Sequence, residues 1–186
     1  SGLANEQGLI YVVPTSLDEL ADDTFFDHPF PSDLRMENGH VRMKGWPNPR
    51  AVPLLDEYIG FIDGKLEGFS PVAAGFLRFT GAIDPETLPD AAGSLEETAS
   101  VQLVDIDPDS PSHGSRTPIY VTFRRDAGVY WQPNTLSFMP VPGYTLRPKT
   151  RYALVVTDGI KAESGDRVVA SPTLREVLGL ESPESD

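Results

Sequence analysis

The chain has 186 residues, enough to bury a hydrophobic core as one domain. Its 28 acidic and 15 basic residues give a formal net charge of −13, which repels phosphate backbones and anionic lipid, so we expect no nucleic-acid partner. The absence of cysteine excludes disulfides and thiolate sites, and no apolar run approaches the roughly 18 residues that span a bilayer. Eighteen Pro and sixteen Gly are typical of short strands joined by turns.

The first 24 residues are expected to form a lead and an edge strand. Residues 1–8 carry no regular pattern, whereas residues 9–13 are β-branched or aromatic and end at Pro14. Proline cannot donate to a strand partner, which places this segment at the edge of a sheet. Residues 1–24 are therefore separated from the main domain, which we expect to span residues 25–171.

Residues 25–34 are rich in aromatics and proline, so we expect an irregular loop pinned by its aromatic side chains. The loop contains Ser32, His28 and Asp33, the residue types of a hydrolase triad. A serine nucleophile needs a strained turn such as G-x-S-x-G, and this motif is absent from the sequence. We therefore predict no catalytic residue.

One helix is predicted near residues 52–63. The apolar side chains there recur every three or four residues: Leu54, Leu55, Tyr58, Ile59, Ile62 and Leu66. Pro53 suits the first turn, and Asp56 and Glu57 suit the positive end of the helix dipole. We expect this helix to cap an open edge or end of the sheets.

The remaining chain is patterned as strands, at residues 41–43, 76–80, 101–105, 119–123, 129–131, 135–138, 146–156 and 167–170. About seven or eight short strands with one inserted helix fit a β-sandwich better than a βαβ fold. The last two strands are expected to form the closing hairpin, through turns at Asp158-Gly159 and Gly165. Tyr152 is placed to bond upstream backbone through its hydroxyl.

Residues 172–186 are expected to form a short helix and a tail toward a possible further domain. The helix is predicted over residues 173–180, with Ser171 or Thr173 as its N-terminal cap.

Asp105, Asp107 and Asp109 form the best candidate for a metal site. Alternate carboxylates on a loop can converge on a hard cation such as Ca²⁺, the one cofactor we consider. The spacing is not that of an EF-hand, because Ser110 and Arg116 replace the glycine and the bidentate acid. A solvated loop in an acidic protein is the favoured interpretation.

Trp131, Tyr130 and Tyr144, with Trp46, are candidates for an aromatic platform that binds sugar or peptide. Strand alternation puts Val129 and Trp131 on one face and Tyr130 on the other, so at least one ring is expected in the core. Core packing is therefore the favoured interpretation of these aromatics.

Three blocks of sequence resemble bacterial Ig-like domains: Phe79-x3-Ile83-Asp84-x2-Thr87-Leu88, Val101-x-Leu103-x-Asp105, and Leu146-x-Pro148-x-Thr150-x-Tyr152 with Asp158-Gly159. Upstream, Phe30-Pro-Ser-Asp-Leu34, Asn48-Pro49 and Gly68-Phe-Ser70 extend the pattern, which is similar to the N-terminal domain of bacterial virulence-factor lipases. This resemblance implies an Ig-like antiparallel sandwich from an exported protein, at the periplasm, the outer-membrane surface or outside the cell. The nucleophile elbow of a lipase, with its downstream acid and histidine, is missing.

Three functions remain open. The first is a non-catalytic structural or interaction module that positions a neighbouring domain, such as a lipase or esterase. The second is an adhesion module that binds a cell-surface protein or glycan. The third is part of a hydrolase active unit. An exposed cluster of Trp131, Tyr130 and Tyr144 favours the second function, whereas their burial favours the first.

Overall fold

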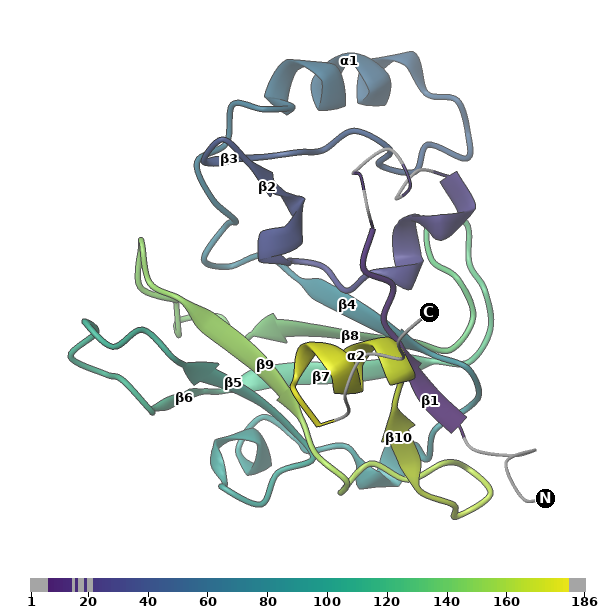
Figure 1. The fold of residues 1–186 in the computed structure, drawn as a ribbon, viewed down its shortest axis with the longest axis vertical. Coiled ribbons are helices and arrows are strands. Elements are labelled where there is room, and N and C mark those ends of the chain that lie inside the picture. The colour runs from purple at the N-terminus through teal and green to yellow at the C-terminus, as the bar shows by residue number, and fades with distance from the viewer. Residues whose placement is uncertain (1–6, 15, 17–18, 20–21, 181–186) are drawn as a thin grey trace.

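The computed structural model describes residues 7–14, 16, 19 and 22–180. The described chain is mostly β, with ten strands in sheets of five, three and two strands, against the seven or eight expected (Figure 1). The strands are β1 (Gln7–Ile10), β2 (Met36–Glu37), β3 (His40–Val41), β4 (Gly75–Phe79), β5 (Val101–Asp105), β6 (Arg116–Thr117), β7 (Ile119–Arg124), β8 (Thr135–Pro140), β9 (Tyr152–Val156) and β10 (Val168–Ala170). The α-helices are α1 (Pro53–Ile62) and α2 (Pro172–Val177), and short 3-10 helices lie at Asp22–Asp27, Asp33–Arg35, Pro85–Thr87 and Gly93–Leu95.

The five-stranded sheet has the order β10-β1-β4-β8-β7. In it β1 runs parallel to β10 and antiparallel to β4, so the predicted edge strand is in fact interior. The prediction was wrong because β10, from the far end of the chain, pairs with the open side of β1. Residues 7 and 8, expected in the lead, belong to this strand.

The predicted closing hairpin is also wrong. Strand β9 pairs with β5 in the three-stranded sheet, whereas β10 lies in the five-stranded sheet. Between them the chain crosses from one sheet to the other, and the crossing is fixed by the fully buried side chains of Ile160 and Ala162.

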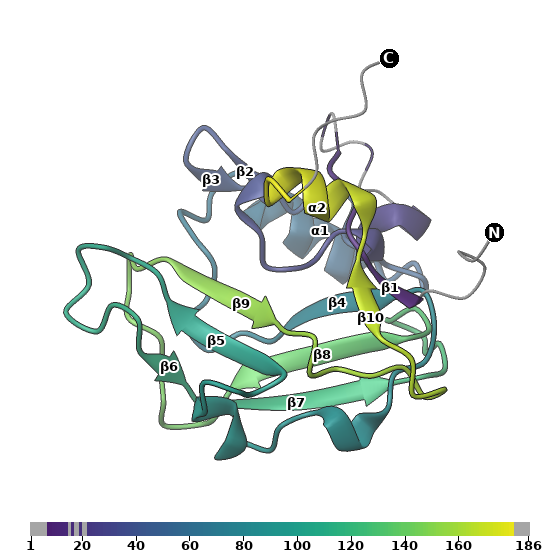
Figure 2. The same ribbon diagram turned by 60° about the horizontal axis from the view of Figure 1, so that its bottom comes forward.

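The five-stranded and three-stranded sheets contribute to one hydrophobic core (Figure 2). Its buried residues come from β4, β5, β7, β8 and the segments beside them: Leu77, Phe79, Ile83, Val101, Leu103, Ile119, Leu136, Phe138 and Ile160. Along β4 the buried and half-buried positions alternate, as expected for a strand with one face in the core.

Tyr152 makes the predicted bond to upstream backbone. Its hydroxyl accepts a hydrogen bond from the backbone N–H of Arg147 at 3.1 Å, and its ring packs against the core. The strand itself begins only at Tyr152, so the predicted extension back to residue 146 is not part of β9.

Helix α1 forms where predicted, but its predicted position over the sheets is wrong. Figure 1 shows it at the far end of the molecule, beyond β2 and β3. None of its residues is fully buried, and Leu54, Tyr58 and Phe61 are 72%, 59% and 67% exposed. The chain just after the helix joins the β3 segment instead, where Val41 exchanges backbone hydrogen bonds with Gly64 and Leu66.

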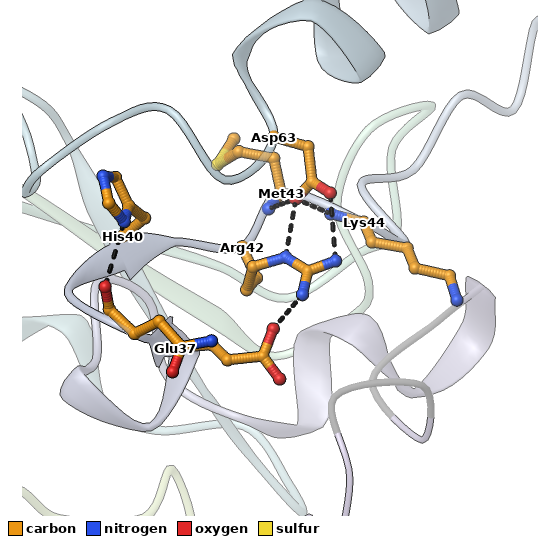
Figure 3. Close-up of polar contacts among 7 residues, drawn as sticks. Glu37, His40, Arg42, Met43, Lys44 and Asp63 are labelled. Atoms are coloured by element: carbon orange, nitrogen blue, oxygen red, sulfur yellow. Dashed lines mark hydrogen bonds and ion pairs between the residues drawn. The ribbon is translucent and has the colours of Figure 1, made fainter.

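Asp63 anchors the C-terminal end of α1 to the strand segment after β3 (Figure 3). Its carboxylate accepts hydrogen bonds from the backbone N–H groups of Met43 at 2.6 Å and Lys44 at 3.1 Å. The carboxylate also accepts hydrogen bonds from Nε and Nη2 of Arg42, at 3.2 and 3.1 Å. Arg42 in turn forms an ion pair with Glu37. Burial raises the pKa of the Asp63 carboxyl, but these hydrogen bonds together lower it below its ordinary value.

The C-terminal helix α2 confirms the Ser171 cap, because the Ser171 Oγ accepts a hydrogen bond from the backbone N–H of Leu174 at 3.2 Å. It ends at Val177, earlier than predicted. The tail from residue 181 and the lead up to residue 6 lie outside the described residues. Among the helices that the structure describes, none has the length and hydropathy to cross a membrane.

We predict that the Asp63 anchor stabilises the fold in a pH-dependent way. The folded pKa of Asp63 lies below its ordinary value of 3.8, so the stabilisation is complete above that pH and is lost as the pH falls through the folded pKa. Asp63→Ala should therefore cost about 1.5–3 kcal/mol at pH 7 and less at pH 3, measured by chemical denaturation. Glu57→Ala, which removes an exposed acid from α1, should have little effect. An equal cost of Asp63→Ala at both pH values would show that the carboxylate charge is not involved.

Candidate ligand-binding pocket

A cluster of aromatic rings joins the N-terminal segments to the five-stranded sheet. Neighbouring ring centroids lie 5.1–6.0 Å apart in this aromatic cluster, which consists of Phe25, Phe26, Phe30, Trp46, Phe69 and Phe76. Phe30 and Phe76 also exchange two backbone hydrogen bonds, of 2.7 and 3.0 Å. The predicted pinning of the 25–34 loop by its aromatics is confirmed, since Phe25, Phe26 and Phe30 are buried.

A pocket of about 340 Å³ lies between the aromatic cluster and the loop that joins β7 to β8. It is lined by Phe25, Phe26, Phe30, Trp46, Pro47, Ala74, Gly75, Phe76, Arg124, Tyr130, Trp131, Thr135 and Ser137. Both tryptophans of the chain are in this lining. The lining is mainly apolar and contains no acidic residue, although the chain as a whole is strongly acidic.

The loop of residues 125–134 holds Trp131 in place. The indole Nε1–H donates to the backbone oxygen of Asp126 at 3.1 Å, and the Trp131 backbone oxygen accepts from the N–H of Gly128 at 2.9 Å. The ring lies so close to Gly128 that a Cβ there would overlap it. The guanidinium carbon of Arg124 lies 4.6 Å from the centre of the same ring, within cation–π range.

The predicted strand over residues 129–131 is wrong, because these residues belong to the loop. Strand alternation therefore does not apply to them, and none of Tyr130, Trp131 and Tyr144 lies in the buried core. Tyr130 is 45% exposed and Tyr144 is 58% exposed, while Trp131 is half-buried. The structure brings Tyr130 and Trp131 together with Trp46, but Tyr144 does not line the pocket.

The phenylalanines of the pocket were missed as site residues. The run of aromatics at residues 25–30 was the available signal, but we interpreted it as loop packing. Arg124 and Phe76 gave no signal, because each is an ordinary residue of a strand until the fold brings them to one place.

A buried cation supports the cluster. Arg35 is 1% exposed, and its guanidinium carbon lies 4.1 Å from the centre of the Phe25 ring. Its Nη2 donates to the backbone oxygen of Phe25 at 3.1 Å. Burial lowers the pKa of Arg35 to about 10, which still leaves the group protonated at neutral pH.

Two of the three candidate metal ligands, Asp105 and Asp107, are used in hydrogen bonds that hold the loop. Asp105 is buried and accepts hydrogen bonds from the hydroxyls of Ser110 at 2.5 Å and Ser112 at 3.0 Å. The Asp107 carboxylate accepts hydrogen bonds from the backbone N–H groups of Asp109 at 3.1 Å and Arg151 at 3.2 Å. Among the residues that the structure describes, no three acidic or histidine side chains are arranged to hold a metal ion. These carboxylates shape the loop between β5 and β6.

Burial raises the pKa of the Asp105 carboxyl, but its hydrogen bonds lower it more, so the group remains ionised at neutral pH.

Ser32, His28 and Asp33 do not form a triad. The Ser32 Oγ accepts a hydrogen bond from the backbone N–H of Leu34, and Nδ1 of the buried His28 bonds to the backbone oxygen of Val12 at 2.8 Å. No hydrogen bond joins these three side chains, all of which lie in the described part of the chain. Burial is the largest influence on His28 and lowers its pKa, which favours the neutral ring.

We predict that Gly128→Ala displaces the Trp131 ring, since the added methyl overlaps the indole. Near-ultraviolet circular dichroism and the indole N–H resonances should change, and overpacking should cost about 1–3 kcal/mol of stability. Gly60→Ala is the matched control, because nothing lies near a Cβ at this helical position. The control should be neutral or stabilise by up to about 1 kcal/mol. An unchanged Trp131 resonance in Gly128→Ala would contradict the packing described.

Comparison with known proteins assigns no family to the chain. No protein-family model matches it, and no curated protein matches it. Any assignment of function therefore depends on the geometry of the pocket and on the chemistry of its residues.

Proposed function

We propose that this chain is a non-catalytic binding module that holds a small ligand in its aromatic pocket. The observation that carries the proposal is the grouping of Trp46, Tyr130 and Trp131 around one pocket of about 340 Å³. Pockets of this size with apolar and aromatic walls are typical of small-molecule sites. The partial exposure of Tyr130 and Trp131 favours binding over a purely structural role.

The scaffold of this module is proposed to be an Ig-like β-sandwich of an exported protein. Two features support the sandwich: the two larger sheets contribute to one core, and the Tyr152 hydroxyl bonds to upstream backbone. The parallel pairing of β1 with β10 departs from an all-antiparallel arrangement. Export and the likeness to the N-terminal domain of virulence-factor lipases are supported by the sequence blocks around residues 30–34, 79–88 and 146–159.

The proposal that the module is non-catalytic is supported by its serine and histidine geometry. Ser32 serves as a cap through its Oγ, and His28 is buried with its Nδ1 bonded to backbone. A serine nucleophile needs a base within hydrogen-bond reach and a set of oxyanion donors.

The experiment uses N-phenyl-1-naphthylamine, a neutral aromatic probe. Because both tryptophans line the pocket, a ligand bound there should shift both indole N–H resonances in a proton–nitrogen correlation spectrum. Trp131→Ala should weaken binding about 5- to 150-fold, because loss of one stacked aromatic group costs about 1–3 kcal/mol. Tyr144→Ala, which removes an exposed aromatic outside the pocket, should leave the affinity unchanged. Absence of any indole shift, or equal effects of the two variants, would refute the pocket as a binding site.

The outward face of α1 favours a second function, that of an interaction module for a neighbouring protein domain. The helix is apolar on both faces: Leu55, Ile59 and Ile62 are half-buried, whereas Leu54, Tyr58 and Phe61 face outward. Helices that are apolar all round are normally covered on both sides. This observation supports the first hypothesis from the sequence, a module that positions its neighbour.

If the outward face serves a partner, it should contribute little to the folding of this chain. We predict that the double variant Leu54→Ser, Phe61→Ser changes the free energy of unfolding by no more than about 0.5 kcal/mol. Ile59→Ser, on the half-buried face, should cost about 1–3 kcal/mol. Denaturant titration of both proteins makes the comparison, and an equally large cost for the double variant would assign that face to the chain's own packing.

A further inference from the structure

We infer that the ligand of the aromatic pocket is a small anionic aromatic molecule: a flat ring system of one or two rings with a carboxylate, sulfonate or phosphate group that binds Arg124. This inference rests on the proposed function, because it identifies the chemistry of the ligand in the same pocket. Three observations carry it: the charge of the lining, the state of its polar groups, and its size.

The charged side chain in the pocket lining is cationic, although the protein as a whole carries a net negative charge. No aspartate or glutamate lines it, although the chain has 28 acidic residues. Arg124 is part of the lining, and Arg50 stands beside it with its guanidinium carbon 5.9 Å from the centre of the Tyr130 ring. Within the described chain neither guanidinium has an acidic partner in ion-pair range, whereas the next residue, Arg125, pairs with Glu163.

An anion at Arg124 would be attracted despite the net charge of −13. At physiological ionic strength the Debye length is about 8 Å, so charges elsewhere on the surface are largely screened, while a guanidinium in contact with the ligand is not. A guanidinium also presents a rigid fork of donors that matches a carboxylate, sulfonate or phosphate. The cation–π contact with Trp131 holds this fork beside the ring platform.

The threonine and serine hydroxyls of the pocket lining already bond to the backbone, which disfavours a neutral sugar. The Thr135 hydroxyl donates to the backbone oxygen of Gln132 at 2.6 Å, and the Ser137 hydroxyl bonds to the backbone oxygen of Thr122 at 3.4 Å. A sugar needs several donors and acceptors for its hydroxyls, and buried polar groups without partners are costly. A flat apolar ring needs none, and it can stack on Trp46, Tyr130 or Trp131.

The volume limits the ring system. An apolar cavity of about 150 Å³ accommodates one benzene ring, so a pocket of about 340 Å³ has room for two rings. Larger polycyclic or long-chain ligands would extend into solvent.

Two dyes with the same rings test the charge requirement directly. In each dye a naphthalene of two fused rings fits the pocket, and the third ring, a phenyl group, extends into solvent. 1-Anilinonaphthalene-8-sulfonate carries a sulfonate, and N-phenyl-1-naphthylamine lacks it. Both are titrated into the intact chain, with the indole N–H resonances of Trp46 and Trp131 reporting pocket binding. We expect the sulfonate dye to bind about tenfold tighter, a preference worth about 1.4 kcal/mol that is typical of a hydrogen bond to a charged group.

The variants assign that preference to one residue. Arg124→Gln should abolish the preference for the sulfonate, so that the two dyes bind this variant with equal affinity. Arg125→Gln removes the same charge from the neighbouring position, outside the pocket, and should preserve the preference. The inference is overturned if both dyes bind equally to the wild-type chain, if Arg124→Gln weakens both dyes alike, or if Arg125→Gln has the same effect. If neither dye shifts the indole resonances, it is the proposed function itself that fails.

Discussion

The packing of Phe76 against Phe25, Phe26 and Phe30 is the contact on which the rest of this structure depends. Phe76 belongs to β4, whereas Phe25 and Phe26 lie in a short 3-10 helix, Asp22–Asp27, and Phe30 follows it. Aromatic rings bury large apolar areas, so this cluster can fix a segment that has only short regular structure of its own. The exchange of hydrogen bonds between Phe30 and Phe76, and the ion pair between Asp27 and Arg78, keep the segment in register with β4.

The α1 region lies away from the two larger sheets, beyond β2 and β3 (Figure 1). The helix is instead held through Asp63 and the backbone around β3, and its outer face remains apolar and uncovered in the described chain. Its stability therefore depends on polar anchoring more than on a hydrophobic core, which is unusual for a helix so rich in apolar residues.

The same cluster forms one wall of the pocket, and the β7–β8 loop forms the other. Neither wall forms the pocket by itself. The aromatic cluster without the loop is only a packed group of rings, and the loop without the cluster is only a turn that carries two aromatic residues. Their separation by the strands of the five-stranded sheet leaves a space lined by aromatic residues from both walls, with the Arg124 guanidinium, which has no acidic partner among the described residues, in its lining. The exclusion of acidic side chains from this space, on a chain of net charge −13, gives the pocket an electrostatic character opposite to that of the protein.

The sequence by itself determined the features that depend on neighbouring residues. These are the mostly β character, the helix beginning at Pro53, the Ser171 cap and the backbone bond of the Tyr152 hydroxyl, each of which follows from local periodicity or capping chemistry. Only the tertiary structure decided the rest. It pairs β1 with β10 across most of the chain, places β9 and β10 in different sheets, and turns residues 129–131 into a loop. The pocket also depends on the tertiary structure. Its residues Phe25, Trp46, Phe76 and Trp131 are far apart in sequence and meet only because strand pairing brings their segments together. A local pattern states which face of a strand is apolar, but not which distant strand will cover it.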